Sequence, residues 1–349
     1  MNTASLPLVD LQAMTRDELA AVIANLGEKT YRVQQVLAWL HQRRVRDVAA
    51  MSDVPAALRA TLTQQYPISP VKLAASTSAA DGTIKALLEL SDGHRIEAVS
   101  MPYESRHTLC LSTQVGCALG CAFCSTGAHG FRRDMTASEI LSQLKIVWEF
   151  CQPEHRPNIV LMGMGEPLRN LNHVLRALTI MTAPWGMDVS KRKITVSTAG
   201  DVPGIAALGR SGLGVMLSIS LNATDNGTRS RIMPINQRYP IEAVLDACRS
   251  FPVPPGRRIT IEYVLIAGIN DSDADAHRLQ RLLRGIPCKI NLIPLNPAEG
   301  FAGKAPSAER ILRFQQVLID GHYSAFIRDS KGAQITAACG QLWEGGSHG

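Results

Sequence analysis

Three cysteines fall within eight residues of the chain, in the stretch Gly116-Cys117-Ala118-Leu119-Gly120-Cys121-Ala122-Phe123-Cys124. Thiolates at this C-x3-C-x2-C spacing can close on one soft metal centre, and three ligands are one short of the four that saturate an iron–sulfur cluster or a tetrahedral zinc. Structural metal sites are normally closed by four protein ligands, whereas a catalytic site leaves a position for the reactant. The stretch therefore predicts a metal centre with an open coordination position.

Two plainer interpretations of these cysteines stay open at this point. Buried thiols can be near neighbours by chance, since free cysteine often packs as a small hydrophobe. Alternatively, His129 lies five residues after Cys124 and could complete a structural zinc site of the Cys3His type. Against zinc, the cysteines are confined to one short loop and lack a second ligand pair at the usual separation.

Length and composition indicate an ordinary globular protein. The 349 residues are 46% hydrophobic and 19% charged, enough for one large domain with an appendage or for two modest domains. Apolar runs are too short to cross a membrane, and residues 1–5 lack the basic and then apolar pattern of a secretory signal. We therefore predict a cytoplasmic protein with no membrane association, whose eight cysteines are thiols or metal ligands.

The formal net charge of +6 favours an anionic partner without requiring one. Basic clusters that could contact phosphates are Arg43-Arg44 with Arg46, Arg132-Arg133, Lys191-Arg192-Lys193 and Arg257-Arg258. Any one of these clusters could equally be a solvated surface. If the cysteines bind structural zinc, the positive charge would indicate an alternative function, that of a non-catalytic zinc-containing RNA-binding protein.

Residues 1–75 are predicted to form a small helical accessory domain. Thr15 and Glu18 have capping-box spacing before an apolar helical face, Thr30 begins a second helix, and Pro55 lies near the start of a third.

Residues 76–102 are predicted to link this domain to the rest of the chain. Two apolar stretches, 84–90 and 96–99, flank the turn Asp92-Gly93, which is typical of a β-hairpin.

Residues 103–335 alternate between strand and helix patterns. Strand candidates begin near Thr108, Asn158, Lys193, Gly214, Arg258 and Cys288, and helical stretches follow most of them. This repetition predicts βαβ units on a parallel sheet. Six units do not fill an eight-fold barrel, so the pattern allows an open partial barrel or a doubly wound sheet.

Polar segments follow several of the predicted strands, and the three-cysteine loop follows the first. These segments are 163–167, 197–200, 218–222 and 294–297. Each alone could be only a turn between a strand and a helix. Ligands gather at the carboxyl ends of parallel strands, so together the segments predict the rim of one pocket.

The cysteine motif with Phe123, followed by Gly163-Met164-Gly165-Glu166-Pro167, resembles the radical S-adenosylmethionine (SAM) superfamily. Further segments are similar to the RNA adenine C2 methyltransferases of the RlmN family, namely Thr108-Leu109-Cys110, Gln114-Val115-Gly116-Cys117-Ala118-Leu119, Phe123-Cys124-Ser125-Thr126-Gly127, Met233-Pro234-Ile235-Asn236 and Ala337-Ala338-Cys339-Gly340-Gln341-Leu342. This similarity extends over most of the chain. It implies an α/β fold, a partial (β/α)6 radical SAM barrel, and a C-terminal segment, 336–349, that carries a methyl-accepting cysteine.

The resemblance also implies the cofactors and the residues that bind them. Cys117, Cys121 and Cys124 would hold a [4Fe-4S] cluster whose fourth iron binds S-adenosyl-L-methionine. An electron from a donor such as flavodoxin would then cleave the sulfonium to a 5′-deoxyadenosyl radical. The positions that match cofactor-contacting residues of the family are Gly165, Glu166, Ser197, Ser220, Leu221, Asn222 and Asn296.

A radical route suits carbon 2 of adenine, which has no acidic proton to remove. By the resemblance, Cys339 would accept a methyl group from one S-adenosylmethionine, and the radical from a second would abstract hydrogen from that methyl. The carbon radical would add to carbon 2, Glu97 would remove the carbon 2 proton, and Cys110 would attack Cys339 to release the product. The implied substrates are large-subunit ribosomal RNA and transfer RNA, and the implied state is a monomer.

The sequence departs from the family pattern at two positions. Asn222 stands where histidine is usual, and Gln334 replaces an acidic residue common shortly before the terminal cysteine motif. Without the family, Cys110 would be read as a buried hydrophobe and Glu97 as a solvent-facing strand residue.

A close relative methylates carbon 8 of the same adenine with the same two cysteines. A carbon 8 methyltransferase of ribosomal RNA that confers antibiotic resistance is therefore an alternative. In either case Arg43, Arg44 and Arg46 of the accessory domain are predicted to grip the RNA, from which a buried adenine must be extruded.

Overall fold

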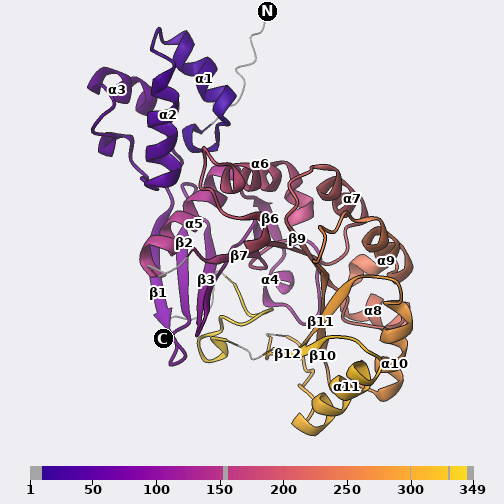
Figure 1. Ribbon diagram of the computed structural model, residues 1–349. Coiled ribbons are helices and arrows are strands. Elements are labelled where there is room, and N and C mark those ends of the chain that lie inside the picture. The colour runs from indigo at the N-terminus through magenta and orange to yellow at the C-terminus, as the bar shows by residue number, and fades with distance from the viewer. Residues whose placement is uncertain (1–9, 152–155, 299, 329–330, 344–349) are drawn as a thin grey trace, which may run out of the picture.

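The accessory domain is a cluster of short helices that forms its own core. The computed structural model describes residues 10–151, 156–298, 300–328 and 331–343 (Figure 1). The three predicted helices are α1 (Arg16–Asn25), α2 (Tyr31–Leu37) and α3 (Ala56–Gln65). Thr15 and Glu18 form the predicted capping box, and Pro55 is the N-cap residue of α3. A separate group of buried side chains, including Leu19, Leu37 and Leu62, holds the helices together.

The accessory helices dock on the core through two helices that follow its first strands. These are α5 (Ala137–Cys151), which begins at the predicted Thr136–Glu139 capping box, and α6 (Leu171–Thr182). Lys145 of α5 is buried and donates to the Gln12 side chain at 2.6 Å, while Arg176 of α6 pairs with Glu18 at 2.6 Å.

Ten strands form one sheet, in the order β1-β2-β3-β4-β7-β8-β9-β10-β11-β12. Its first strands, paired antiparallel, are β1 (Lys72–Ser78), β2 (Ile84–Glu89), β3 (Arg95–Tyr103) and β4 (Arg106–Cys110). The strands that continue in parallel from β4 are β7 (Asn158–Leu161), β8 (Ile194–Thr198), β9 (Met216–Ser220), β10 (Ile259–Leu265), β11 (Cys288–Pro294) and β12 (Ala325–Ile327). Strands β1 and β12 lie at the two edges, so the described sheet is open.

Helices line the outer side of the parallel strands and the described chain returns along the inner side (Figure 1). After α5 and α6, the outer helices are α7 (Val202–Arg210), α8 (Asn226–Ile232), α9 (Ile241–Ser250), α10 (Asp273–Leu282) and α11 (Ala308–Asp320). Apolar residues of the strands and of these helices form one continuous core, with Ile219, Ile261 and Phe314 fully buried. In the part of the chain that the structure describes, no helix is long and apolar enough to span a bilayer.

The predicted strands and the predicted open α/β architecture are confirmed. All six strand candidates form parallel strands, and the predicted hairpin is the pair β2 and β3. Two strands were not anticipated. The polar strand β1 extends the hairpin to three strands, and the three-residue β12 adds a seventh parallel strand. The hairpin also belongs to the core sheet, because β3 pairs with β4 along five residues.

Candidate active site

The three-cysteine loop lies between β5 (Gln114–Gly116) and the short helix α4 (Ser125–Ala128), beyond the carboxyl end of β4. Backbone bonds hold it at both ends, from Cys117 N to Gly130 O at 2.9 Å and from Ala122 N to Ile232 O at 2.9 Å. A third bond, from Cys124 N to Cys121 O at 3.1 Å, tightens the loop itself.

The cysteine side chains of this loop suit a cationic cluster. Burial raises the pKa of Cys121 well above its ordinary value, and the neighbouring Cys124 and Cys117 raise it further. The three sulfurs are therefore close enough to repel one another as thiolates. Coordination by a metal deprotonates a thiol outright and neutralises that repulsion. By its chemistry this donor set fits a soft iron–sulfur cluster, although the described side chains, as they stand here, are not gathered around one metal position.

Glu166 connects the loops that follow β7 and β8 and borders the three-cysteine loop. Its Oε2 accepts a hydrogen bond from Ala199 N at 2.8 Å, and its Oε1 accepts one from Leu168 N at 3.1 Å. Burial raises the pKa of Glu166 to about 7, although these hydrogen bonds oppose the shift. The preceding Gly165 has φ +100° and passes so close to Gln114 that a Cβ would lie 2.5 Å from the Gln114 Cβ. Only glycine fits there without displacing the loop.

Arg229 holds the remaining loops of the rim together through hydrogen bonds. It was not among the site residues predicted from the sequence. The side chain is fully buried, and its guanidinium donates to Ala199 O at 2.6 Å, Leu221 O at 2.9 Å and Asn236 Oδ1 at 3.0 Å. It thus joins the ends of β8 and β9 to the Met233–Asn236 motif. The pattern Thr228-Arg229-Ser230-Arg231 looks like a solvated helix face, so no local signal identifies it.

The predicted cofactor contact Asn222 bonds to protein groups in this structure. It adopts φ +58°, a left-handed conformation that asparagine tolerates better than most residues. Its Oδ1 accepts from Val264 N at 2.8 Å, and its Nδ2 donates to Met233 Sδ at 3.2 Å. The asparagine that departs from the family pattern therefore fastens the end of β9 to β10.

A cavity of about 610 Å³ runs along the inner face of the sheet, and its lining includes Cys110, Asn296 and Cys339. The three come from the end of β4, the loop after β11 and the C-terminal segment. Burial raises the pKa of the Cys110 thiol, and the nearby Cys339 raises it further. Cys339 has an exposed surface, and desolvation by the protein around its thiol raises its pKa to about 11. The fold therefore places on one cavity the two cysteines that, by the family resemblance, are expected to react with each other.

The C-terminal segment rests directly on the three-cysteine loop. Ser125 N donates to Gly340 O at 2.7 Å, and Thr126 Oγ1 donates to Leu342 O at 2.5 Å. The His129 ring stacks on Trp343, with centroids 3.6 Å apart and planes 11° from parallel. In this structure His129 thus helps to fix the segment that carries Cys339, and the described contacts give the zinc alternative no support.

Glu97 is buried, contrary to its ordinary reading as a solvent-facing residue, but it does not line the cavity. Its Oε1 lies 2.9 Å from Lys85 Nζ, and its Oε2 accepts from Trp343 N at 2.9 Å. Lys85 in turn donates to Thr336 Oγ1 at 2.9 Å. The carboxylate predicted to be the base thus holds the C-terminal segment against β2 and β3.

The other predicted residues lie on the rim. Ser197 belongs to β8, Ser220 ends β9, and Leu221 is fully buried behind them. Asn296 Nδ2 donates to Cys339 O at 3.1 Å. Gln334 is exposed on a 3-10 turn, Ala333–Ile335.

The fold and the site define a radical SAM enzyme: an open α/β sheet with a C-x3-C-x2-C loop at its carboxyl edge. Residues 111–279 match the model of the radical SAM superfamily, and residues 9–68 match that of the ribosomal RNA large subunit methyltransferase N-terminal domain. A crystal structure of a radical SAM methyltransferase from Sphaerobacter thermophilus superimposes with a TM-score of 0.91 at 44% identity, covering 96% of this chain and 99% of that one.

Curated relatives narrow the class to one family. The dual-specificity RNA methyltransferase RlmN of Geobacter sulfurreducens is 48% identical over 96% of this chain and 92% of its own length. That of Desulfotalea psychrophila is 44% identical over 96% and 94%. The chain belongs to the RlmN family of radical SAM RNA methyltransferases, whose cofactors are a [4Fe-4S] cluster and S-adenosylmethionine.

Proposed function

We propose that this protein methylates carbon 2 of adenine in large-subunit ribosomal RNA and in transfer RNA, with Cys339 as the methyl carrier. The observation that supports this most strongly is the meeting of Cys110 and Cys339 in one cavity. The cavity lies next to the three-cysteine loop, because the C-terminal segment is bonded to Ser125 and Thr126.

We assign the cluster to Cys117, Cys121 and Cys124; when bound, it supplies the electron that cleaves S-adenosylmethionine. Glu166, Gly165, Ser197, Ser220, Leu221 and Asn222 form the rim against which that cofactor is held. Asn296 holds Cys339 in place through the backbone carbonyl of that residue, at 3.1 Å.

The two cysteines divide the transfer between them. Cys339 Sγ gives up its proton and accepts a methyl group. Once that carbon, now a methylene, is bonded to carbon 2 and the adduct has lost the carbon 2 proton and one electron, the Cys110 thiolate attacks Cys339 Sγ. A disulfide forms as the carbon–sulfur bond breaks, and the electron pair of that bond passes to the methylene carbon, which takes up a proton to become the methyl group. The single electron would return to the cluster when that is bound. We propose Glu97 as the base that takes the carbon 2 proton. Because Glu97 lies outside the cavity, its carboxylate must leave Lys85 and the Trp343 amide to do so.

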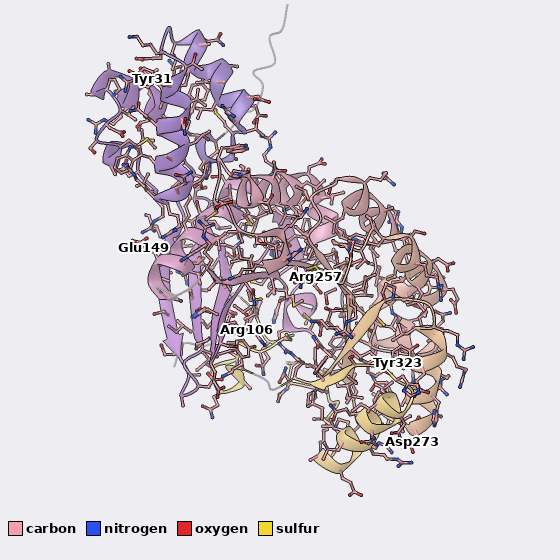
Figure 2. All side chains as sticks on the ribbon, in the orientation of Figure 1. Tyr31, Arg106, Glu149, Arg257, Asp273 and Tyr323 are labelled. Carbon is pink, nitrogen blue, oxygen red and sulfur yellow. The ribbon has the colours of Figure 1, made fainter. Side chains whose placement is uncertain are left out.

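We also propose that the accessory domain contacts RNA through Arg43, Arg44 and Arg46. These arginines lie where that domain meets the core, near Glu149 (Figure 2). Arg43 stacks 3.9 Å over Trp39, Arg44 stacks 4.8 Å over Trp148, and Arg46 pairs with Glu149 at 3.2 Å. Cations oriented in this way can still present one face to a phosphate.

We expect the protein to act as a cytoplasmic monomer that receives electrons from a small donor such as flavodoxin. All eight cysteines are unpaired, which suits a reducing compartment. Light scattering of the purified protein tests the oligomeric state directly.

Substitution of the two cavity cysteines tests the proposed function. With reconstituted enzyme and ribosomal RNA, Cys339→Ala should give no methylated nucleoside, whereas Cys110→Ala should leave RNA covalently attached to the protein. The control Cys151→Ala, on α5, should keep full transfer. Nucleoside mass spectrometry should show 2-methyladenosine; 8-methyladenosine alone would establish the alternative position, and transfer by Cys339→Ala would refute the mechanism.

A further inference from the structure

The cavity that holds Cys110 and Cys339 extends to the opposite, amino edge of the parallel strands. Its lining there includes Arg106 and Asn158, the first residues of β4 and β7, and Arg258, which immediately precedes β10. Arg192 and Lys193 precede β8 in the same way. The cavity therefore has a cofactor end, at the carboxyl edge, and a second end that we call the amino-edge mouth.

Cations dominate the lining of this cavity. The cationic lining residues are Arg106, Arg192, Lys193, Arg257, Arg258, Lys289, Arg328 and Lys331. Among the described lining residues the single acid is Glu262, which accepts from Ser218 Oγ at 3.0 Å and from Asn291 Nδ2 at 3.1 Å. Such an excess of positive charge at a concave surface attracts polyanions from a distance.

Several of these cations are oriented without being neutralised. Arg106 stacks over the Tyr103 ring at 4.4 Å, and Arg258 Nη1 donates to Ser324 Oγ at 2.8 Å. Within the described residues, the guanidinium groups of Arg192 and Arg257 have no hydrogen-bond or ion-pair partner. In the view of Figure 2 the labels of Arg106 and Arg257 lie near the centre rather than over the outer helices.

An aromatic side chain lies among these cations. Phe326, on the edge strand β12, is 48% exposed and lines the same cavity. It is paired in register with Asn291 of β11, which also lines the cavity. An exposed ring in a cavity that is also lined by cations can stack an unpaired base, since every base has a flat apolar face.

The acceptor cysteine is within reach of this mouth. Glu262 contributes to the electrostatics of Cys339 and is three residues beyond the first residue of β10. Cys339 and the cations of the amino-edge mouth line the same cavity, so a nucleotide extruded from RNA at the mouth can reach Cys339 without leaving that cavity.

We infer that substrate RNA docks on the amino-edge mouth: phosphates contact Arg192 and Arg257, and the extruded nucleotide stacks on Phe326 on its way to Cys339. This inference rests on the proposed function, because it names the route by which the RNA substrate enters that same site. At the cofactor end the C-terminal segment covers the three-cysteine loop, so we place the RNA at the opposite end.

RNA binding and its salt dependence test the phosphate contacts. The variant Arg192→Gln/Arg257→Gln should weaken binding of a fluorescent RNA stem-loop substrate to the cluster-loaded enzyme about tenfold. It should also lower the slope of log K against log salt by about 1 per lost contact. The matched control Arg231→Gln/Arg281→Gln removes two exposed charges from the outer helices α8 and α10, and it should bind like the parent protein.

Phe326→Ala tests the stacking contact. It should weaken binding about tenfold while leaving the salt slope unchanged, since stacking releases no counterions. Phe326→Trp should restore binding, and Leu312→Ala, at a residue of α11 that is 58% exposed, should have no effect.

Parent-like affinity and salt slope in the arginine double variant, or equal weakening in its control, would overturn the inference. Reductive formation of 5′-deoxyadenosine without RNA should be the same in all variants, because none touches the rim. If the parent protein binds RNA through the mouth and forms 5′-deoxyadenosine but never methylates adenine, the proposed function fails while the docking surface stands.

Discussion

The two ends of the cavity are built in opposite ways. At the carboxyl edge, three buried charged side chains have protein partners: Arg229 has backbone carbonyls, Glu166 has backbone amides, and Glu97 has Lys85. At the amino edge, Arg192 and Arg257 have no partner within the described residues, and their charges face the cavity. Groups that hold a small cofactor are fixed by partners within the protein. Cations that bind a polyanion have no protein partner, because the phosphates of the polyanion take that place.

This contrast predicts that substitutions at the two ends affect different properties, namely stability at the carboxyl edge and RNA binding at the amino edge. Substitutions at the carboxyl edge should lower the free energy of unfolding, because they leave buried polar groups without their hydrogen-bond partners. Substitutions at the amino edge should cost RNA affinity and leave the fold intact.

The largest effect on stability is expected at the buried pair Lys85–Glu97, whose side chains are 5% and 1% exposed. Lys85→Met removes the cation that lies 2.9 Å from the buried Glu97 carboxylate, so the free energy of unfolding should fall by about 3–5 kcal/mol. Lys72→Met, at an exposed position of the neighbouring strand β1, is the control. Urea denaturation measures both, and equal effects of the two would contradict the importance of the pair.

A somewhat smaller loss is expected at Arg229. Arg229→Met removes the donors to Ala199 O and Leu221 O while keeping much of the side-chain volume, so stability should fall by about 2–4 kcal/mol. Arg231→Met, on the exposed face of the same helix, should change it by less than about 0.5 kcal/mol. A parent-like melting profile for Arg229→Met would show that the rim loops hold without it.

A pH-dependent effect is expected where the accessory domain meets the core. Burial lowers the pKa of Lys145 to about 7, although the charge of Asp10 opposes the shift. The unfolded chain, with a lysine pKa near 10.4, binds more protons between these values, so stability should rise with pH from about 7 to 10. The slope from this group is at most about 1.4 kcal/mol per pH unit. Denaturation of Lys145→Met across this range should lack that contribution; identical slopes would refute it.

The smallest effect is expected at the mouth. Arg257→Gln removes no described contact of its side chain, so the free energy of unfolding should stay within about 0.5 kcal/mol of the parent value. A larger loss in urea would mean that this guanidinium serves the fold, and it would weaken the contrast between the two ends.

Local patterns predicted much of the architecture. The capping boxes at Thr15 and Thr136 and the Asp92-Gly93 turn mark element boundaries through hydrogen bonds that span only a few residues. Strand β1 escaped prediction because its seven residues are mostly polar and exposed, and β12 because it is three residues long. Such strands form because a neighbouring strand supplies backbone hydrogen-bond partners. That pairing leaves no periodic pattern in the sequence.

The sequence by itself determined the cysteine loop, the order of strands and helices, and the family to which the chain belongs, since these depend on residue types at short and regular spacings. Only the tertiary structure decided that Cys110 and Cys339 line one cavity with Arg192, Arg257 and Phe326, and that Glu97 is buried against Lys85. Those arrangements depend on the curvature of the sheet and on the return of the C-terminal segment across it. Contacts between residues so distant in the chain are fixed by packing, which no local pattern records.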